Sequence, residues 1–143
     1  MKMEGYSLGL LKPDCIQRGL TETILEMVRA TGLEIVATRT LTLTKENVEI
    51  FYKGYREDDY FDSLLQFMQS GPVIGFIVKG ENAIEVLNEL VGFTEPSKAK
   101  PGTIRAMGID VCYNLAHSSH SKLDFLREAK VIFCEQLKDI EVL

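Results

Sequence analysis

The chain has 143 residues, a length that suits one domain with a single continuous core. Hydrophobic residues make up 45% of it and charged residues 26%, a composition that excludes a disordered or fibrous protein. Its 16 Lys and Arg against 21 Asp and Glu give a formal net charge of -5, which disfavours a general nucleic-acid or anionic-membrane surface but leaves room for a local basic pocket.

Cysteine usage and the start of the chain bear on the compartment. The three cysteines are odd in number and far apart, without a CxxC pair, so neither a zinc ribbon nor a disulfide framework is expected. Reduced thiols in a cytoplasm are the simplest account of them. The N-terminal sequence has only a few apolar residues before Lys-Pro-Asp, fewer than a signal peptide or a membrane span requires. We therefore expect a cytoplasmic protein without a membrane partner.

The N-terminal part of the sequence predicts a strand, a helix and a second strand. Residues 6–11 are a short apolar run that stops at Lys-Pro, which is typical of a buried strand. Apolar residues at helical spacing over 20–28 predict a helix, and Gly32 suits its C-terminal cap. Residues 35–43 alternate and are rich in β-branched side chains, which predicts the second strand.

Two short helices are expected next, one beginning at Thr44 and one around Phe61. An apolar third strand is expected over 73–78, after a Ser-Gly-Pro break. Apolar residues at helical spacing over 84–91 predict another helix, which Gly92 closes. In these elements, the spacing of apolar residues again changes between the pattern of a helix and that of a strand.

The C-terminal part of the sequence begins with a long loop over 93–105, which contains two prolines and is of a length that is usually functional. A final strand is expected over 111–116. Ser121 and Asp124 resemble a capping box for a last helix, which we expect to bury Leu123. No repeat or linker divides the chain, so residues 1–143 are predicted to form one α+β domain, a ferredoxin-like βαββαβ sandwich with an antiparallel four-stranded sheet and added helices.

Both histidines of the chain, His117 and His120, lie in one polar stretch, NLAHSSHS. A metal site needs three or four ligands, and no Cys or carboxylate cluster accompanies them, so no protein-held metal is expected. The serines suggest a solvated turn. The other interpretation is a phosphoryl acceptor, because Lys12 and Arg105 at apparent strand ends could neutralise phosphate charge and Glu128 could orient an imidazole. The residues alone leave the turn and the acceptor both open.

Four segments, in order and at nearly the right distances, resemble the nucleoside diphosphate kinase family: KPDCIQRGL, SGPVIGFIVKGENA, KPGTIR and NLAHSSHS. The resemblance runs over about residues 6–133. It implies ping-pong transfer of the γ-phosphate from a nucleoside triphosphate to a diphosphate (ATP, ADP, GTP, GDP and others) through a phosphohistidine. It also implies Mg²⁺ held mainly by the nucleotide phosphates, and a homo-oligomer, either a tetramer or a hexamer.

The resemblance assigns catalytic roles to five positions. His117 matches the phosphorylated histidine, which attacks through Nδ1 in this family, and Glu128 matches the carboxylate that orients it. Ser119 matches the serine whose hydroxyl bonds that carboxylate. Lys12 and Tyr52 match a cation and a phenol beside the transferring phosphate. On pattern alone, Lys12 could also be a solvated strand end and Tyr52 a half-buried helix residue.

Seven positions match the family's nucleotide ligands: Lys12, Tyr60, Leu64, Thr94, Arg105, Val111 and Asn114. Arg105 and Thr94 match phosphate ligands, and Asn114 matches a ligand of the sugar hydroxyl. Tyr60 falls where an aromatic ring stacks on the base, with Leu64 and Val111 as apolar walls. Stacking tolerates any base, because every base has a π-face.

The sequence departs from the family at several of these places. Asn88 stands at a further nucleotide-binding position, where an arginine usually contacts the phosphates, and His120 replaces an aspartate. Ser118 replaces a glycine, and Tyr113 an arginine. We expect an active kinase with altered phosphate contacts, in which protonated His120 partly replaces the missing cation. The alternative is a nucleotide-binding regulatory or scaffold protein of the same fold with weak or lost kinase activity.

Overall fold

The structure is a computed structural model, and it describes residues 4–52, 59, 61–110 and 113–133. Its sheet has four strands in the order β2-β3-β1-β4, and every neighbouring pair is antiparallel. The strands are β1 (Glu4–Leu11), β2 (Glu34–Leu41), β3 (Val73–Glu81) and β4 (Ala116–Ser118). The predicted α+β fold with a four-stranded antiparallel sheet is confirmed.

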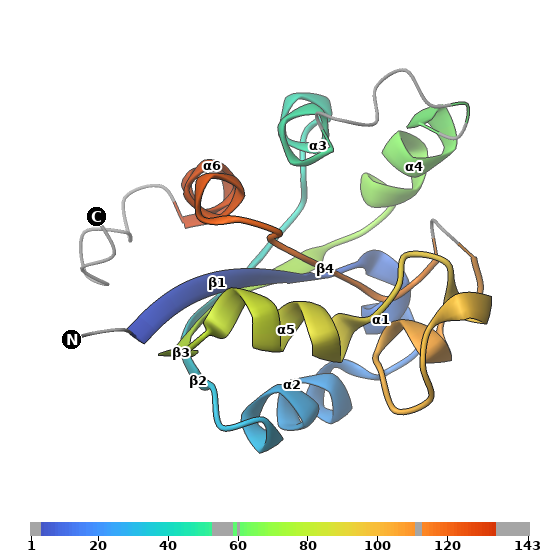
Figure 1. Cartoon of the computed structure of the whole chain (residues 1–143). Helices are drawn as coiled ribbons and strands as arrows, with labels where there is room; N and C mark the ends of the chain where they lie inside the picture. The colour runs from blue at the N-terminus through green and yellow to red at the C-terminus, as the bar shows by residue number, and fades with distance from the viewer. Residues whose placement is uncertain (1–3, 53–58, 60, 111–112, 134–143) are drawn as a thin grey trace.

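Helices cover both faces of the sheet, with α3, α4 and α6 on one face and α1, α2 and α5 on the other (Figure 1). Their bounds are α1 (Pro13–Gln17), α2 (Thr21–Ala30), α3 (Lys45–Phe51), α4 (Phe61–Met68), α5 (Ala83–Val91) and α6 (Lys122–Phe133). Two short 3-10 helices, η2 (Pro96–Lys98) and η3 (Arg105–Met107), lie in the loop after α5. None of the helices within the described residues is long and apolar enough to cross a membrane.

The two helix layers enclose two apolar cores. Leu8 and Leu10 of β1 join the core under α3, α4 and α6, which we call the upper core. Leu11 and Phe76 join the core against α1, α2 and α5, which we call the lower core. Because successive side chains of a strand point to opposite faces, β1 and β3 need apolar residues at nearly every position. That is why both read as continuous apolar runs in the sequence.

Local signals fix most of the element ends as expected. Thr44 and Asn47 form a reciprocal capping box at the start of α3. The Ser121 hydroxyl accepts a hydrogen bond from the backbone N–H of Asp124 at 3.0 Å, which caps α6. Gly92 ends α5 with φ at 92°, and a Cβ there would stand 2.7 Å from the Thr103 hydroxyl. Only glycine suits this position, so the start of the long loop is fixed.

Two expectations are wrong in detail, and one short helix is not expected from the sequence. The first strand ends before Lys12 as predicted, but Pro13 then opens the short helix α1, at a position where its missing N–H costs nothing. The strand expected over 111–116 is observed as β4, over residues 116–118, with residues 111–112 outside the described part. His117 therefore lies on a strand and not in a turn. Leu123 is 77% exposed, because it lies on the outer face of α6.

Candidate active site

His117 projects from β4 into the upper layer. It is the antiparallel partner of Leu10, so the two side chains lie on the same face of the sheet, the face that α3 and α6 cover. The residue is only 6% exposed. Its ring lies edge-on against Phe51 and Tyr52 at the end of α3, with a centroid separation of 5.5 Å in each case. These rings limit how far the imidazole can rotate.

One ring nitrogen of His117 is bound to Glu128 of α6. The Nε2–H donates to Glu128 Oε1 at 2.9 Å, and the carboxylate is 2% exposed. The Ser119 hydroxyl donates to the same oxygen at 2.7 Å, and Arg127 Nη2 donates to Oε2 at 3.4 Å. A carboxylate can only accept here, so the proton of the neutral imidazole is on Nε2 and the lone pair is on Nδ1. This is the arrangement of an oriented nucleophile.

Lys12 brings a buried cation to the same region. The residue before a proline is restricted to extended backbone, and Lys12 has φ -81° and ψ 166° between β1 and α1. Its Nζ donates to Asn114 Oδ1 at 2.8 Å and lies 5.8 Å from the centre of the Phe67 ring. Asn114 Nδ2 donates in turn to the carbonyl of Thr94 at 2.8 Å. Lys12 and Asn114 are therefore held together although they are 102 positions apart in sequence.

Arg105 ties the long loop to β4 and to α5. It is 7% exposed, and its Nε donates to the carbonyl of Ala116 at 3.0 Å, one residue before His117. Its Nη1 donates to the carbonyl of Gly92 at 3.2 Å. The guanidinium brings a permanent positive charge close to the nucleophile strand.

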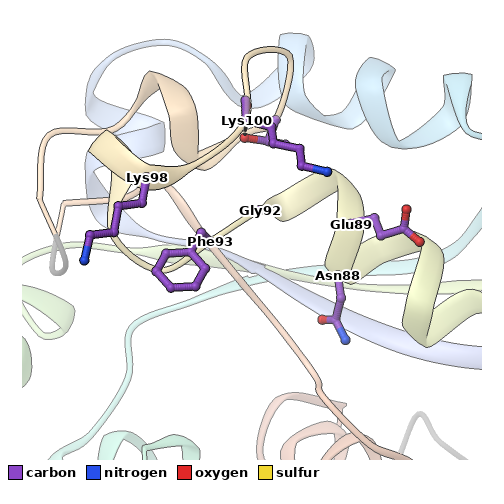
Figure 2. Close-up of a pocket in the computed structure, with 7 residues that line it drawn as sticks. Asn88, Glu89, Gly92, Phe93, Lys98 and Lys100 are labelled. Carbon is purple, nitrogen blue, oxygen red and sulfur yellow. Dashed lines mark hydrogen bonds between the residues drawn. The ribbon is translucent and has the colours of Figure 1, made fainter.

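Asn88, on the last turn of α5, is joined to the residue after the histidine. The Ser118 hydroxyl donates to Asn88 Oδ1 at 2.6 Å, and Ser118 is 2% exposed. Beside Asn88 lies a hollow of about 380 Å³, whose floor and rim are Asn88, Glu89, Gly92, Phe93, Lys98, Lys100 and Thr103. Figure 2 shows Asn88 on the helix side of this hollow, with Phe93 and Lys98 on the loop side. The contact between α5 and β4 is thus neutral at this point.

His120 is exposed and lies just after β4 in the sequence. Its ring is 6.4 Å from that of His117 and nearly perpendicular to it. Desolvation lowers the pKa of His120 below its ordinary value, and its interactions with His117 and with the positive charge of Arg105 act in the same direction. The carboxylates of Glu128 and Asp124 oppose this shift without overcoming it. His120 is therefore mainly neutral near pH 7.

The structure brings together most of the residues that the sequence analysis named. His117, Glu128, Ser119 and Tyr52 form one connected group. The Lys12 group described above is a second one, joined to the first through the backbone between Asn114 and His117. Thr94 is exposed and enters through its backbone carbonyl, whereas Leu64 is 2% exposed within the upper core. Tyr60 and Val111 lie outside the described residues.

Several neighbours of the site escaped the sequence analysis. Phe67 packs beneath Lys12, and the Tyr113 ring lies on Phe67 with a centroid separation of 4.1 Å. A hollow of about 530 Å³ adjoins this pair, lined by Ser63, Gln66, Phe67, Ser70, Asp110 and Tyr113. Arg127 is the third donor to Glu128. No local signal marks these residues, because their partners are distant in sequence, except that Tyr113 stands where the family resemblance implies an arginine.

Within the described part of the chain, no three His, Cys, Asp or Glu side chains gather as a metal-ligand set. The residues described above instead combine an imidazole whose Nδ1 lone pair could act as a nucleophile, two buried cations and several hydrogen-bond donors. Such donors suit the oxygens of a transferring phosphoryl group, whose charge they neutralise. The fold and the site together define an α+β phosphotransferase that acts through a histidine.

The comparisons with known proteins agree. The model of the family described as "Nucleoside diphosphate kinase" matches residues 6–137, and the chain belongs to this family. A nucleoside diphosphate kinase of Staphylothermus marinus is 40% identical over 138 residues, which are 96% of this chain and 95% of that relative. One of Archaeoglobus fulgidus is also 40% identical, over 88% of this chain and 84% of the relative.

Solved structures of this family have the same fold. The Aquifex aeolicus nucleoside diphosphate kinase has a TM-score of 0.85 and 34% identity, over 91% of this chain and 95% of that one. A halophilic nucleoside diphosphate kinase of Halobacterium salinarum, in complex with CDP, has a TM-score of 0.86 and 31% identity, over 91% and 88%. The family transfers phosphate between nucleoside tri- and diphosphates through a phosphohistidine, and the prediction of such an enzyme is confirmed.

Proposed function

We propose that His117 is the residue of this chain that carries the phosphoryl group. The observation that supports it most directly is the 2.9 Å bond from His117 Nε2–H to Glu128. Nδ1 attacks the γ-phosphorus of the triphosphate, a bond forms between Nδ1 and phosphorus, and the bond from phosphorus to the β-γ bridging oxygen breaks. The diphosphate leaves with that electron pair, and a second diphosphate takes the phosphoryl group by the reverse steps.

Glu128 contributes at the moment when charge develops. Phosphorylation of Nδ1 gives the ring imidazolium character, and the carboxylate on Nε2–H is placed to offset it. Ser119 and Arg127 hold the carboxylate on its two oxygens. No proton has to leave the ring during the transfer, because the nucleophilic nitrogen carries none. We assign Ser119 and Glu128 to orienting the histidine.

The remaining contacts are assigned to the nucleotide. Lys12, Arg105 and the Tyr52 phenol serve the phosphates, together with Thr94, while Asn114 serves the sugar hydroxyl. The buried cations and the link from Lys12 to Asn114 support this, because they bring charge and an amide to one place. We further propose that Tyr60, Val111 and Leu64 contact the base, as the family resemblance implies.

Asn88 serves, in this proposal, as a neutral phosphate ligand. The Ser118 hydroxyl engages its oxygen, which orients the carboxamide so that Nδ2 is the outward donor. A charged hydrogen bond to phosphate contributes about 1.5–3 kcal/mol and a neutral one about 0.5–1.5 kcal/mol. Nucleotide affinity is therefore weaker than an arginine at position 88 would give.

We propose that Mg²⁺ enters on the nucleotide phosphates and not on a protein-held site. The donor set fits this, because Lys12 and Arg105 suit anionic phosphate oxygens and the described residues offer no carboxylate cluster. When bound there, Mg²⁺ would supply positive charge that offsets the negative charge developing on the phosphate oxygens, beside the Lys12 and Arg105 cations.

The experiment that tests the assignment is phosphoenzyme trapping with γ-labelled ATP. Wild type should acquire acid-labile label and pass it to ADP or GDP, and His117→Ala should acquire none. His120→Ala is the matched control. It removes the other histidine of the chain, three residues after His117, and should still be labelled. Undiminished labelling of His117→Ala would contradict the proposal. Nucleotide binding without any exchange would favour the regulatory alternative.

We also propose that the chain forms a homo-oligomer, a tetramer or a hexamer, and that it is cytoplasmic. The family resemblance supports the first. The buried thiol of Cys15, which forms no disulfide, supports the second, and burial raises its pKa to about 12. Sedimentation velocity and cell fractionation test the two statements, and a monomer at micromolar concentration would contradict the first.

A further inference from the structure

The backbone between Asn114 and His117 is strained. Leu115 has φ at 76°, and the N–H of Ala116 donates to the carbonyl of Asn114 at 2.9 Å. A bond from residue i+2 back to residue i, with positive φ between them, is a γ-turn of the rare and unfavourable kind. A leucine at its centre adds the cost of a Cβ in this region of φ. Something else must hold this turn.

Two groups from the start of α1 hold the peptide units of Leu115. The N–H of Leu115 donates to Asp14 Oδ2 at 3.2 Å, and its carbonyl accepts from the backbone N–H of Lys12 at 2.9 Å. Pro13 lies between these two residues, keeps Lys12 extended and begins α1, which lies near β4 (Figure 1). The Lys-Pro-Asp sequence therefore hydrogen-bonds both the N–H and the carbonyl of Leu115, at the centre of the turn.

Asp14 is an unfavourable residue to bury. It is 4% exposed, and within the described part of the chain its Oδ1 has no hydrogen-bond partner. Burial raises the pKa of its carboxyl above the ordinary value, although the neighbouring Lys12 cation and the backbone N–H groups of Leu115, Asp14 and Cys15 lower it. A buried carboxylate oxygen without a partner calls for an explanation other than stability.

We propose that Asp14 is a positioning residue, which holds the strained turn at Leu115 and thereby fixes Asn114 and His117 relative to each other. The proposal rests on the assignment of His117 as the phosphoryl acceptor. His117 is anchored to α6 through Glu128, and Asn114 is anchored to Lys12 and Thr94. Without Asp14 the turn relaxes toward negative φ, and the distance between these two anchored side chains is no longer set.

The test compares Asp14→Ala, which removes the acceptor, with Asp14→Asn, which keeps an amide oxygen in its place. The control is Ile24→Val, a mild change in the same lower core that leaves the turn untouched. Single-turnover labelling of His117 by γ-labelled ATP should slow on the order of 10- to 100-fold in Asp14→Ala, since misplacement by about 1 Å costs that much. Asp14→Asn should stay within about threefold of wild type, because its oxygen still accepts.

A second readout does not depend on activity. Amide hydrogen exchange at Leu115, followed by NMR in the full chain, should be protected in wild type and Asp14→Asn and accelerated in Asp14→Ala, with neighbouring lower-core amides unchanged. Exchange at Leu115 that Asp14→Ala leaves unchanged overturns the proposal. So does a rate in Asp14→Ala no slower than in Ile24→Val, or an Asn variant as slow as the Ala variant. If His117→Ala is still labelled, the catalytic assignment fails. The hydrogen-exchange measurement at Leu115 then tests by itself whether Asp14 holds the turn.

Discussion

The two faces of β4 at the candidate site are built differently. On the α6 side, the Nε2–H, both oxygens of Glu128, the Ser119 hydroxyl and an Arg127 nitrogen are joined in one charged network. On the α5 side, Ser118 and Asn88 form a neutral pair beside an open hollow. In the proposed function, the α6 side orients His117 as the nucleophile, and the α5 side provides a ligand for the phosphates.

The difference separates two tasks that one site must perform. Orientation of the imidazole depends on a buried acceptor and tolerates little change, because a wrong tautomer removes the lone pair from Nδ1. Attraction of phosphate depends on charge at longer range, which several residues share. The residues that the family resemblance implies for the first set are all present, whereas in the second set Asn88 stands where the resemblance implies an arginine. We therefore expect chemistry to be maintained and affinity to be altered.

The largest effect is expected from a substitution that disrupts the hydrogen-bond network on the α6 side. Glu128→Gln places an amide opposite Nε2, where its NH₂ group can donate and move the imidazole proton to Nδ1. Labelling of His117 should slow on the order of 100-fold or more, as measured by rapid-quench single turnover. Ser119→Ala, which removes one donor and leaves the acceptor, should cost only about 3- to 10-fold. Equal rates for Glu128→Gln and wild type would mean that the carboxylate does not set the tautomer.

The next largest effect is expected from a substitution that places a positive charge on the α5 side. Asn88→Arg should tighten binding of a triphosphate about 10-fold at low ionic strength, since a cation strengthens the hydrogen bond to phosphate. The gain should shrink at high salt, where exposed charges are screened. Glu89→Gln, at the exposed neighbouring position of α5, raises the net charge by the same one unit and is the control for charge alone. Calorimetric titration at two salt concentrations checks it, and an equal gain from both variants would remove the special role of position 88.

A smaller effect concerns His120 and pH. Its pKa is lowered, so His120 gains its proton only as pH falls below its ordinary range, and bound phosphate favours that gain. ADP affinity of wild type relative to His120→Ala should therefore rise from pH 8 to pH 5, reaching about threefold, the size of an exposed ion pair. Fluorescence titration across this range measures it. An unchanged ratio would show that His120 does not replace the missing cation.

The smallest expected effect is on the free energy of unfolding, which the buried carboxylate of Asp14 lowers. Its folded pKa lies above the ordinary value of 3.8, so ionisation opposes folding. The penalty is absent below the unfolded pKa and complete above the folded pKa. Asp14→Asn should therefore gain free energy of unfolding relative to wild type as pH rises from about 3 to 7, in urea titrations. Asp62→Asn, at an exposed position of α4, is the control, and a difference that does not change with pH would contradict this sign.

The sequence alone predicted much of the fold. Apolar runs, alternation and caps such as Thr44 and Gly92 set most elements, because these signals act within a few residues. Helix α1 was missed, since Pro13 is read as a break as easily as a first helical residue. Leu123 was placed in the core because it is apolar, but only the packing angle of α6 decides which of its faces is buried.

For the site, the sequence determined which groups are present, and the tertiary structure decided which of them meet. The nucleophile, its carboxylate and the cations were named from motifs. The bond from Ser118 to Asn88 joins residues 30 positions apart, and Asp14 reaches Leu115 across 101 positions. Contacts of this kind depend on how β1, β4 and α5 converge, a geometry set by the packing of the whole sheet and not by any local pattern. The strained turn beside His117 persists for the same reason, because only groups brought from the other end of the chain hold it.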